Sequence, residues 1–229
     1  MFCMNILLTP IPSMASLAKG RHVSIDLRRM GNANLRDGHS CLMDLLMVAI
    51  SGIFLFLPAL LPNSAAVLFG GGTPVDFGRT WRGKRILGDG KTWTGLIGGV
   101  SAGTSLGLLL AILTTALDAS ESWRWGLGLM PIGVVFSLSL GSLLGDMAGA
   151  FIKRRLGMVR GQKAAGLDQY DFVIGALGLT ALTYPGWLWA HYLDGEAVIA
   201  LIALLVFVPL LHRSVNIIGF KLGKKKEPW

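Results

Sequence analysis

The chain has 229 residues, of which 52% are hydrophobic and 15% are charged, with a net charge of +8 at pH 7. Soluble globular proteins carry about 25% charged residues, so the composition excludes an ordinary soluble domain and predicts an integral membrane protein. The positive charge is compatible with nucleic acid, anionic lipid or an anionic substrate. In a membrane protein it is typical of cytoplasmic loops, and we predict no nucleic-acid partner. The four histidines are scattered, which argues against catalysis built on histidine.

Residues 1–42 differ in character from the rest of the chain. They contain the polar, basic run AKGRHVSIDLRRMGNANLRDGHS, which has no helical or strand period. This segment could be a disordered tail, a targeting segment or the product of a misassigned translation start, although it lacks the continuous apolar core of a secretory signal. Because an apolar segment follows directly from Met43, we favour the misassigned start and expect residues 43–229 to form a single membrane-embedded domain.

Apolar segments dominate the chain after Met43. A helix needs about 20 apolar residues to cross the hydrocarbon core of a bilayer. The sequence therefore predicts an all-α integral membrane protein with about five transmembrane helices, at Leu45–Leu61, Trp93–Leu117, Trp125–Ile152, Phe172–Ala190 and Ala197–Phe220. Glycines recur every four residues in the second segment, from Gly95, and in the third, from Gly141, which is typical of helices that pack closely within lipid.

The connecting segments predict the orientation of these helices. Lysine and arginine are concentrated in residues 63–92, in residues 153–171 and in the tail, and five spans place all three on one side. The other side carries the stretches DASESWR and HYLDGE, with Arg124 as the single basic residue. The basic side is expected to be cytoplasmic, which places residue 43 outside and the C-terminus inside. The basic residues 1–42 would then lie outside, against the charge rule, which adds weight to the misassigned start.

The stretch FGGGTPVDFGRTWRGKRILGDGKTW predicts a glycine-rich, basic cytoplasmic loop. It ends in Gly90-Lys91-Thr92, like the phosphate-binding loop of many nucleotide-binding proteins, but Arg85 stands where that loop needs glycine and no apolar strand precedes it. The adaptable backbone and the basic side chains still suit phosphate oxygens, while the plainer explanation is the charge bias of cytoplasmic loops with lipid-headgroup contact. The candidate substrate-binding residues are Arg79, Arg82, Lys84, Arg85, Asp89, Lys91, Thr92 and, from the later basic stretch, Arg154.

Acidic residues near two predicted helix ends form the second candidate. Asp146 lies inside an apolar span, where a charge is costly and often functional, and Lys153 follows two turns later on the same face. Asp168 and Asp171 share a face at the start of the next span. A structural ion pair and favourable charges at a helix N-terminus are the plainer explanations. Together, carboxylates and basic residues at one membrane face favour an Mg²⁺ site and phosphoryl or nucleotidyl transfer, with Asp146, Asp168 and Asp171 as metal ligands.

These two regions resemble one known family. The stretch GGGTPVDFGRTWRGKRILGDGKTWTG resembles the first cytoplasmic loop of archaeal CDP-archaeol synthases, and GDMAGAFIKRRLG followed by LDQYDFVIGALG resembles their later motif. That family is related to CDP-diacylglycerol synthases, whose pattern has Gly-Asp and then Lys-Arg at the spacing of Gly145-Asp146 and Lys153-Arg154. The chain departs from the bacterial pattern at Ala150, where serine is frequent, at Gln169, where arginine is usual, and at RGQKAAG, which replaces a Pro-Gly-His-Gly-Gly stretch.

The resemblance implies a reaction. CTP and unsaturated archaetidic acid, an isoprenoid diether lipid phosphate (2,3-bis-O-geranylgeranyl-sn-glycerol 1-phosphate), would give CDP-archaeol and pyrophosphate, with Mg²⁺ as cofactor. Residues 43–229 would then be a catalytic domain in the cell membrane, with its active site facing the cytoplasm. The catalytic residues carried over are Asp146, Lys153, Asp168 and Asp171. A homo-oligomer is compatible with the sequence but is not indicated by it.

Two other classes stay open at this point. A small transporter is compatible with an intramembrane acid such as Asp146 and with glycine-rich helices, although transporters often show internal repeats and none is visible here. A structural membrane protein would use the acids as helix caps and ion-pair partners, and it leaves the glycine-rich basic loop unexplained.

Overall fold

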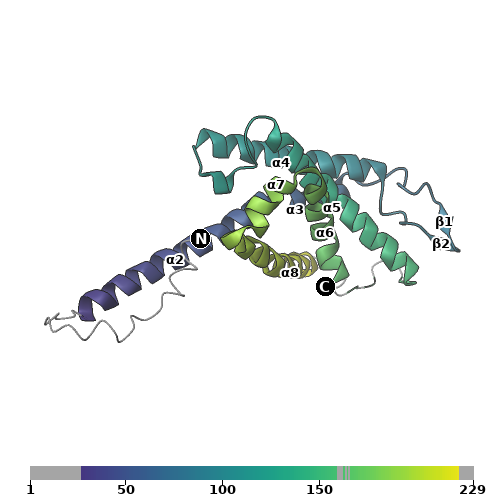
Figure 1. Cartoon of the computed structure of the whole chain (residues 1–229). Helices are drawn as coiled ribbons and strands as arrows, with labels where there is room; N and C mark the ends of the chain where they lie inside the picture. The colour runs from purple at the N-terminus through teal and green to yellow at the C-terminus, as the bar shows by residue number, and fades with distance from the viewer. Residues whose placement is uncertain (1–26, 159–161, 163, 165, 222–229) are drawn as a thin grey trace, which may run out of the picture.

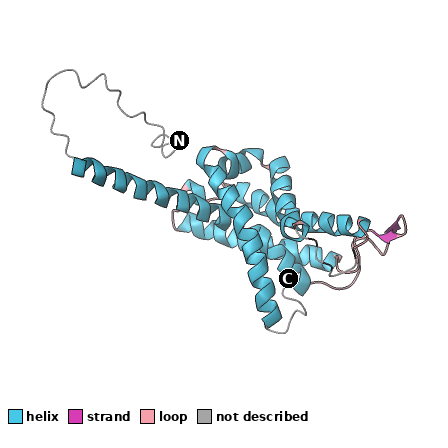
Figure 2. Ribbon diagram, turned by 90° about the horizontal axis from the view of Figure 1, so that it is seen from below, coloured by secondary structure: helices cyan, strands magenta, loops and turns pink. Residues whose placement is uncertain are grey.

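The protein is described by a computed structural model, which places residues 27–158, 162, 164 and 166–221. Residues 1–26 of the expected extension lie outside this range, as do Arg160, Lys163 and the lysines of the tail after residue 221. The described chain is mostly helical (Figures 1 and 2), and the class predicted from the sequence, an all-α membrane protein, is confirmed.

The first two helices are nearly continuous. Helix α2 covers Leu27–Leu55, and α3 covers Leu57–Leu68 after a break at Phe56. Together, Cys41–Leu68 is long and apolar enough to cross a membrane. The structure differs from the expectation for residues 1–42, because α2 begins at Leu27 and runs without a break through Met43, projecting away from the other helices in Figure 1. The misassigned start stays a prediction.

Four further long helices follow, with short helical pieces between them. Helix α4 covers Trp93–Ala116, α5 covers Met130–Arg155, α6 covers Leu167–Thr183 and α8 covers Val198–Lys221. The short pieces are the 3₁₀ turn η2 at Glu121–Trp123, helix α7 at Pro185–Leu188, the π-helical turn η3 at Trp189–Leu193 and the 3₁₀ turn η4 at Gly195–Ala197. The loop between α3 and α4 carries a small antiparallel hairpin, with β1 at Thr80–Trp81 and β2 at Lys84–Arg85. The sequence did not predict this hairpin.

The helix boundaries differ from the predicted spans in several places, and the first predicted span, Leu45–Leu61, is interrupted at Phe56. The fourth predicted span, Phe172–Ala190, ends early because Pro185 cannot continue the backbone hydrogen bonding of α6. The third, Trp125–Ile152, begins late, at Met130, and the buried Trp125 belongs to the preceding loop. Among the described residues, three single spans pass by length and composition, and the pair Pro185–Leu193 and Gly195–Leu211, bent by 78°, is a fourth if it is one span. The count of five therefore stays a prediction.

Glycines let the central helices approach closely. A Cβ atom on Gly145 of α5 would clash with the backbone oxygen of Asp171 on α6, and one on Gly175 would lie 2.5 Å from the Cα of Gly145. On α4, a Cβ atom on Gly103 would lie 2.6 Å from the backbone oxygen of Pro58 on α3. These contacts confirm the close packing predicted from the glycine rows.

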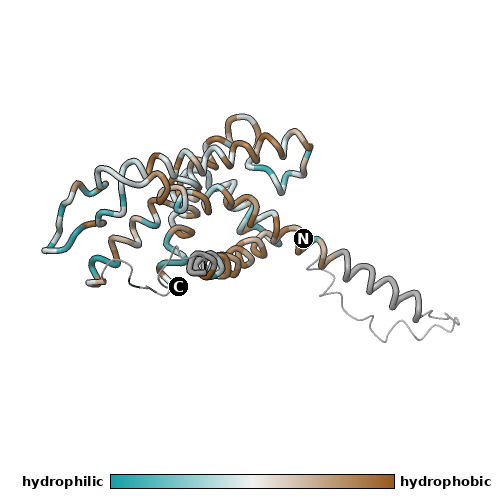
Figure 3. Tube along the Cα trace, turned by 180° about the vertical axis from the view of Figure 1, so that it is seen from behind, coloured by the Kyte–Doolittle hydropathy of each residue, from teal (hydrophilic) through white to brown (hydrophobic). Residues whose placement is uncertain are grey.

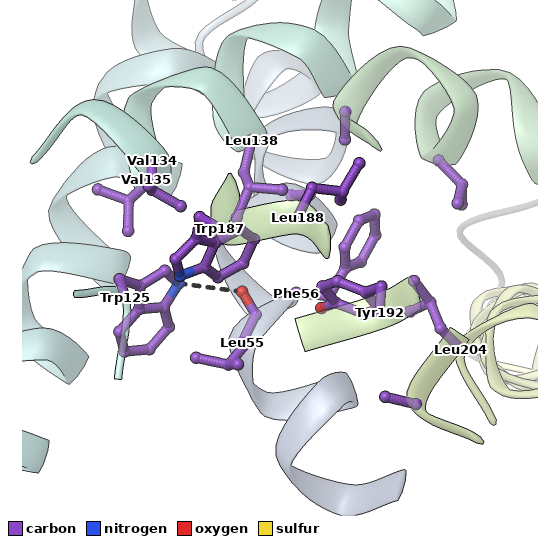
Figure 4. Packing of buried hydrophobic residues seen from close by; sticks show 14 of the residues in the cluster. Leu55, Phe56, Trp125, Val134, Val135, Leu138, Trp187, Leu188, Tyr192 and Leu204 are labelled. Atoms are coloured by element: carbon purple, nitrogen blue, oxygen red, sulfur yellow. Dashed lines mark hydrogen bonds between the residues drawn. The ribbon is translucent and has the colours of Figure 1, made fainter. Parts of the chain in front are cut away.

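The largest fully buried side chains include Trp125, Tyr192, Phe56 and Leu55. Figure 4 shows Trp125, Trp187 and Tyr192 packed around Leu55 and Phe56, at the break between α2 and α3. The Trp125 indole N–H donates to the backbone oxygen of Leu55 at 3.1 Å, so the polar atom of the buried ring is satisfied. Figure 3 shows hydrophilic residues at the two ends of the bundle, in the hairpin loop and in the turn after α4, with hydrophobic residues along the helices between them.

Candidate active site

A buried carboxylate organises the loop between α3 and α4. Asp76, whose side chain is 1% exposed, accepts hydrogen bonds from the backbone N–H groups of Gly78 (3.1 Å), Leu87 (2.9 Å) and Gly88 (3.0 Å). The Arg85 guanidinium adds a bond of 2.9 Å and a longer one of 3.4 Å. Burial alone raises the pKa of Asp76, but these donors outweigh it and hold the pKa well below its usual range. Asp76 was not among the predicted site residues; the available signal was that it is one of only two acids, with Asp89, in the basic, glycine-rich loop.

The end of the loop is tied to its beginning at α4. The backbone N–H of Val75 donates to the oxygen of Lys91 at 2.8 Å, and that of Trp93 donates to Thr73 at 3.1 Å. Thr92 caps α4: its hydroxyl oxygen accepts from the N–H of Gly95 at 3.2 Å, and also from that of Gly71. These contacts fix Lys91 at the first turn of a membrane helix. That Thr92 binds substrate stays a prediction. In this structure its hydroxyl oxygen is already engaged in capping α4.

The hairpin is attached to the C-terminal end of α5. Arg82 and Gly83 form its turn and both have positive φ angles, as a tight two-residue hairpin turn requires. Arg155 donates to the backbone oxygens of Trp81 (2.5 Å), Lys84 (3.1 Å) and Arg85 (2.5 Å). The Trp81 ring also stacks on Phe151 of α5, with ring centres 5.7 Å apart. Arg85 accepts from Arg155 through its backbone oxygen and donates to Asp76 through its side chain, so it links the helix end to the loop that Asp76 organises.

Two ion pairs connect the loop, α5 and α6, and a third lies within the loop. Lys91 pairs with Asp146 of α5, which brings the loop end to the predicted intramembrane acid. Lys153, two turns further along α5, pairs with Asp168 at the start of α6 with 2.6 Å between the charged atoms. Within the loop, Arg85 pairs with Asp89 at 2.6 Å. Three residues from the loop and three from the later motif thus meet in these ion pairs, at one end of the bundle or close beside it.

Asp171 lies at the contact between α5 and α6. Its residue is 9% exposed, and its Oδ1 accepts from the backbone N–H of Phe172 at 2.7 Å. A Cβ atom on Gly149 would clash with Asp171 Oδ2, so the missing side chain at Gly149 is what makes room for the carboxylate. Asp171 also lies within electrostatic range of Asp146, Lys153 and Lys91.

Two cavities flank Lys91. The first, which we call the basic cavity, has a volume of about 340 Å³ and is lined among others by Arg85, Asp89, Lys91, Lys153 and Arg154. The second, which we call the inner cavity, has about 60 Å³ and lies between α3, α4 and α5, lined by Lys91 and Asp146 together with Asn63 and apolar side chains. Gly90 and Lys91 belong to both linings, so the loop end separates the two spaces.

The structure gathers some of the predicted site residues and leaves others apart. Of the predicted substrate-binding set, Arg79, Arg82 and Lys84 line neither cavity: they belong to the hairpin and its base, where Arg82 lies over the Trp81 ring and Lys84 donates to Arg155. Asp168 and Asp171 also line neither cavity. Within the described residues, no group of three or more acidic, histidine or cysteine side chains is arranged to hold a metal ion. The shared metal site of Asp146, Asp168 and Asp171 stays a prediction.

The fold and the site define a class of protein. A basic cavity at the ends of membrane helices, next to a second space with apolar walls, is the arrangement expected of an intramembrane enzyme that acts on a phosphate compound. The chain belongs to the CarS-like family of CDP-archaeol synthases, whose family model matches residues 42–229.

Individual relatives agree with this assignment. The CDP-archaeol synthase of Methanospirillum hungatei is 48% identical over 180 residues, covering 76% of this chain and 99% of the relative. That of Pyrococcus horikoshii is 45% identical over 181 residues, covering 79% and 96%. A solved structure of an intramembrane enzyme for archaeal membrane lipid biosynthesis is 38% identical, with a TM-score of 0.56, and covers 74% of this chain and 94% of its own.

Proposed function

We propose that this protein joins CTP to unsaturated archaetidic acid, giving CDP-archaeol and pyrophosphate, with Mg²⁺ as cofactor and with the active site on the cytoplasmic face of the cell membrane. Membership of the CDP-archaeol synthase family supports the overall reaction. The structural observation that carries the proposal is the position of Lys91, which pairs with Asp146 and belongs to the walls of both cavities.

Each cavity suits one of the two substrates. The basic cavity, at about 340 Å³, lies within the usual size range of small-molecule sites, roughly 300–1,000 Å³. Its arginine forks and lysine ammonium groups are the side chains that bind phosphate oxygens best, so we assign the triphosphate of CTP to it. The inner cavity has apolar walls beside Lys91, and we assign the lipid phosphate to it.

The two assignments bring the reacting groups together at Lys91. An anionic oxygen of the lipid phosphate forms a bond to the α-phosphorus of CTP. The bond from that phosphorus to the oxygen bridging the α and β phosphates breaks, and pyrophosphate leaves with the bonding electrons. The attacking oxygen is already ionised, so no base is needed, and the protein contributes mainly position and positive charge. Lys91 lies where it can neutralise both phosphates, while Lys153 and Arg154 face the basic cavity on the side of the triphosphate.

The donor set fits Mg²⁺ in chemistry. Mg²⁺ is usually held by one or two carboxylates together with waters and substrate phosphates. Asp146 and Asp171 are within electrostatic range of each other, and Gly149 leaves room for the Asp171 carboxylate, so these two acids would hold the ion. Asp168 would join them after release from Lys153. When bound, Mg²⁺ supplies positive charge that neutralises the triphosphate and the leaving pyrophosphate.

The test is an assay of the detergent-purified chain with labelled CTP and the diether lipid phosphate, with and without Mg²⁺. We expect label in the lipid fraction and release of pyrophosphate in equal amounts, both abolished by a chelator and restored by added Mg²⁺. Lys91→Ala should weaken substrate use by about 1.5–3 kcal/mol, the range for hydrogen bonds to charged groups. Absence of a labelled lipid product, together with passage of either substrate across proteoliposomes unchanged, would contradict the proposal and favour a transporter.

A further inference from the structure

Asn63 of α3 is a partly buried polar residue that the proposed reaction does not use. Its Oδ1 atom is enclosed by protein and has no hydrogen-bond partner. A buried acceptor without a partner costs about 1–3 kcal/mol, and most such groups in proteins are satisfied. Because Asn63 also lines a cavity, its unpaired side-chain oxygen indicates a partner that is not part of the protein.

The surroundings of Asn63 restrict that partner. Asn63 lines the inner cavity together with Ala66 and Val67, which follow three and four residues later on the same face of α3. Lys91, Thr92 and Asp146 complete the polar part of the lining. At about 60 Å³ the cavity holds only a few heavy atoms, because one water needs roughly 10–15 Å³ of such volume. The space therefore takes one small polar group, such as a phosphate or part of a glycerol unit, and neither a nucleoside nor a hydrocarbon chain fits inside it.

The rest of the lining points towards the lipid side. Leu96, Leu143 and Met147 contribute apolar walls, and Val67 is 80% exposed on a helix that belongs to a candidate membrane span. A ligand with an anionic group beside Lys91 and a hydrocarbon chain that leaves the cavity past Val67 matches the polar and the apolar walls of the cavity. A soluble nucleotide would leave the apolar walls uncovered.

The side-chain amide of Asn63 can form hydrogen bonds with the oxygens of such a ligand. Its carbonyl accepts and its NH₂ group donates, and a half-turn of the amide exchanges the two ends. The ether and phosphate oxygens of a diether glycerol phosphate are mostly acceptors. We propose that Asn63 binds the glycerol-phosphate head group of the lipid substrate, donating a hydrogen bond from its side-chain amide to a head-group oxygen beside Lys91. This assignment rests on the proposed function for the identity of the lipid.

The chain offers a matched control. Thr104 of α4 also carries a buried side-chain oxygen without a partner, but it lines neither the inner nor the basic cavity. Asn63→Leu and Thr104→Val each replace an unpaired buried polar group by an apolar one of similar size. Both variants should therefore fold with a melting temperature equal to or above that of the unaltered protein.

The experiment measures binding without turnover. Full-length protein in detergent micelles is titrated with the diether lipid phosphate in the absence of CTP, and the affinity is taken from the rise in melting temperature. We expect Asn63→Leu to weaken lipid binding at least tenfold and Thr104→Val to change it less than twofold. CTP affinity, measured in the same way with Mg²⁺, should be unchanged in both. Asn63→Ser, which keeps one donor and needs little space, should lie between Asn63→Leu and the unaltered protein.

The outcomes separate this inference from the proposed function. If Asn63→Leu, or Asn63→Ser should the leucine variant not fold, binds the lipid as tightly as the unaltered protein, the inference is overturned. An equal loss of CTP affinity overturns it as well. The proposed function is tested by turnover of the unaltered protein. Absence of turnover together with Asn63-dependent lipid binding would remove the function and keep the lipid site.

Discussion

The guanidinium group of Arg155, at the end of α5, donates to the backbone oxygen of Trp81 and lies 5.3 Å from the centre of the Trp81 ring. Two further bonds to backbone oxygens of β2 make Arg155 the main contact between the hairpin and the helix that carries Asp146. The hairpin lies beside the basic cavity, and its second strand supplies Arg85 to the lining. Arg155 therefore positions the loop that is predicted to bind substrate, without lining either cavity itself.

Replacement of Arg155 should weaken nucleotide use more than it slows chemistry. Arg155→Ala removes all three bonds to the hairpin, so we expect the KM for CTP to rise about tenfold, which corresponds to about 1.4 kcal/mol, with a smaller change in kcat. Arg155→Lys keeps the charge but loses the planar fork, and should recover only part of the effect. Steady-state kinetics check this. Asp118→Asn, which alters an exposed ion pair in the turn after α4, serves as the control. An unchanged KM in Arg155→Ala would show that the hairpin does not shape the CTP site.

Close packing of α5 on α6 depends on glycine at particular positions. A Cβ atom on Gly145 would clash with the backbone of Asp171, whereas a Cβ atom on Gly178 of α6 meets nothing within 4 Å. Gly145→Ala should therefore lower the melting temperature and displace Asp171, with loss of activity, at a cost of about 1–3 kcal/mol for overpacking. Gly178→Ala adds the same atom to open space and should be neutral or slightly stabilising, since alanine favours helix over glycine. Similar melting temperatures for the two variants would contradict the packing argument.

The helices were predictable to the extent that their cause is local. Apolar length and glycine spacing are properties of consecutive residues, so the sequence indicated the class, most of the helical segments and the close helix contacts. The break after α6 was also encoded locally, in Pro185, but the apolar residues on both sides concealed it. The burial of Trp125 was not predictable, because its partner Leu55 is far away in the chain.

The site was predictable in its chemistry more than in its arrangement. Basic residues in one loop and acids at two helix ends indicated phosphate binding at one membrane face. Which base would pair with which acid depends on tertiary packing, and the pairs Lys91 with Asp146 and Lys153 with Asp168 could not be derived from spacing. Asp76 was missed for the same reason, since its donors come together only when residues 76–88 form a closed loop.

The negative charge of Asp76 should determine how well ordered the loop between α3 and α4 is. Asp76→Asn keeps the size but removes the charge that accepts from Arg85 and from the backbone, so we expect a loss of about 1.5–3 kcal/mol in local loop stability. Hydrogen exchange of the Leu87 and Gly88 amides measures this directly, because both donate to Asp76. Protection of these amides should fall in the variant, while that of core amides in α5 stays the same.

The lowered pKa of Asp76 also predicts the pH response of this loop. A carboxyl group whose pKa is lower in the folded than in the unfolded chain contributes stability that is present above the unfolded value, near 3.9, and is lost as pH falls towards the folded value. Protection of the two amides, corrected for intrinsic exchange, should therefore be constant from about pH 8 to pH 5. A decline within that interval would show that Asp76 is not held ionised as its donors imply.

The three acids should respond differently to removal of their charge. If Asp146 and Asp171 hold Mg²⁺, then Asp146→Asn and Asp171→Asn should remain folded, lose most turnover and need at least tenfold more Mg²⁺ for the rise in melting temperature that the ion produces in the presence of CTP. Asp146 should be the less tolerant position, because it also pairs with Lys91 and lines the inner cavity, whereas Asp171 lines neither cavity. Asp168 is engaged with Lys153 at 2.6 Å, so Asp168→Asn should also lower the melting temperature without any ligand, by leaving a partly buried lysine unpaired.

A structural role for Asp146 predicts the reverse for that residue, since Asp146→Asn would free Lys91, lower the melting temperature and leave the folded fraction active. Melting temperature and Mg²⁺-dependent turnover, measured on the same three preparations, separate these cases. Near-normal turnover of Asp146→Asn at low Mg²⁺ would remove Asp146 from the metal site.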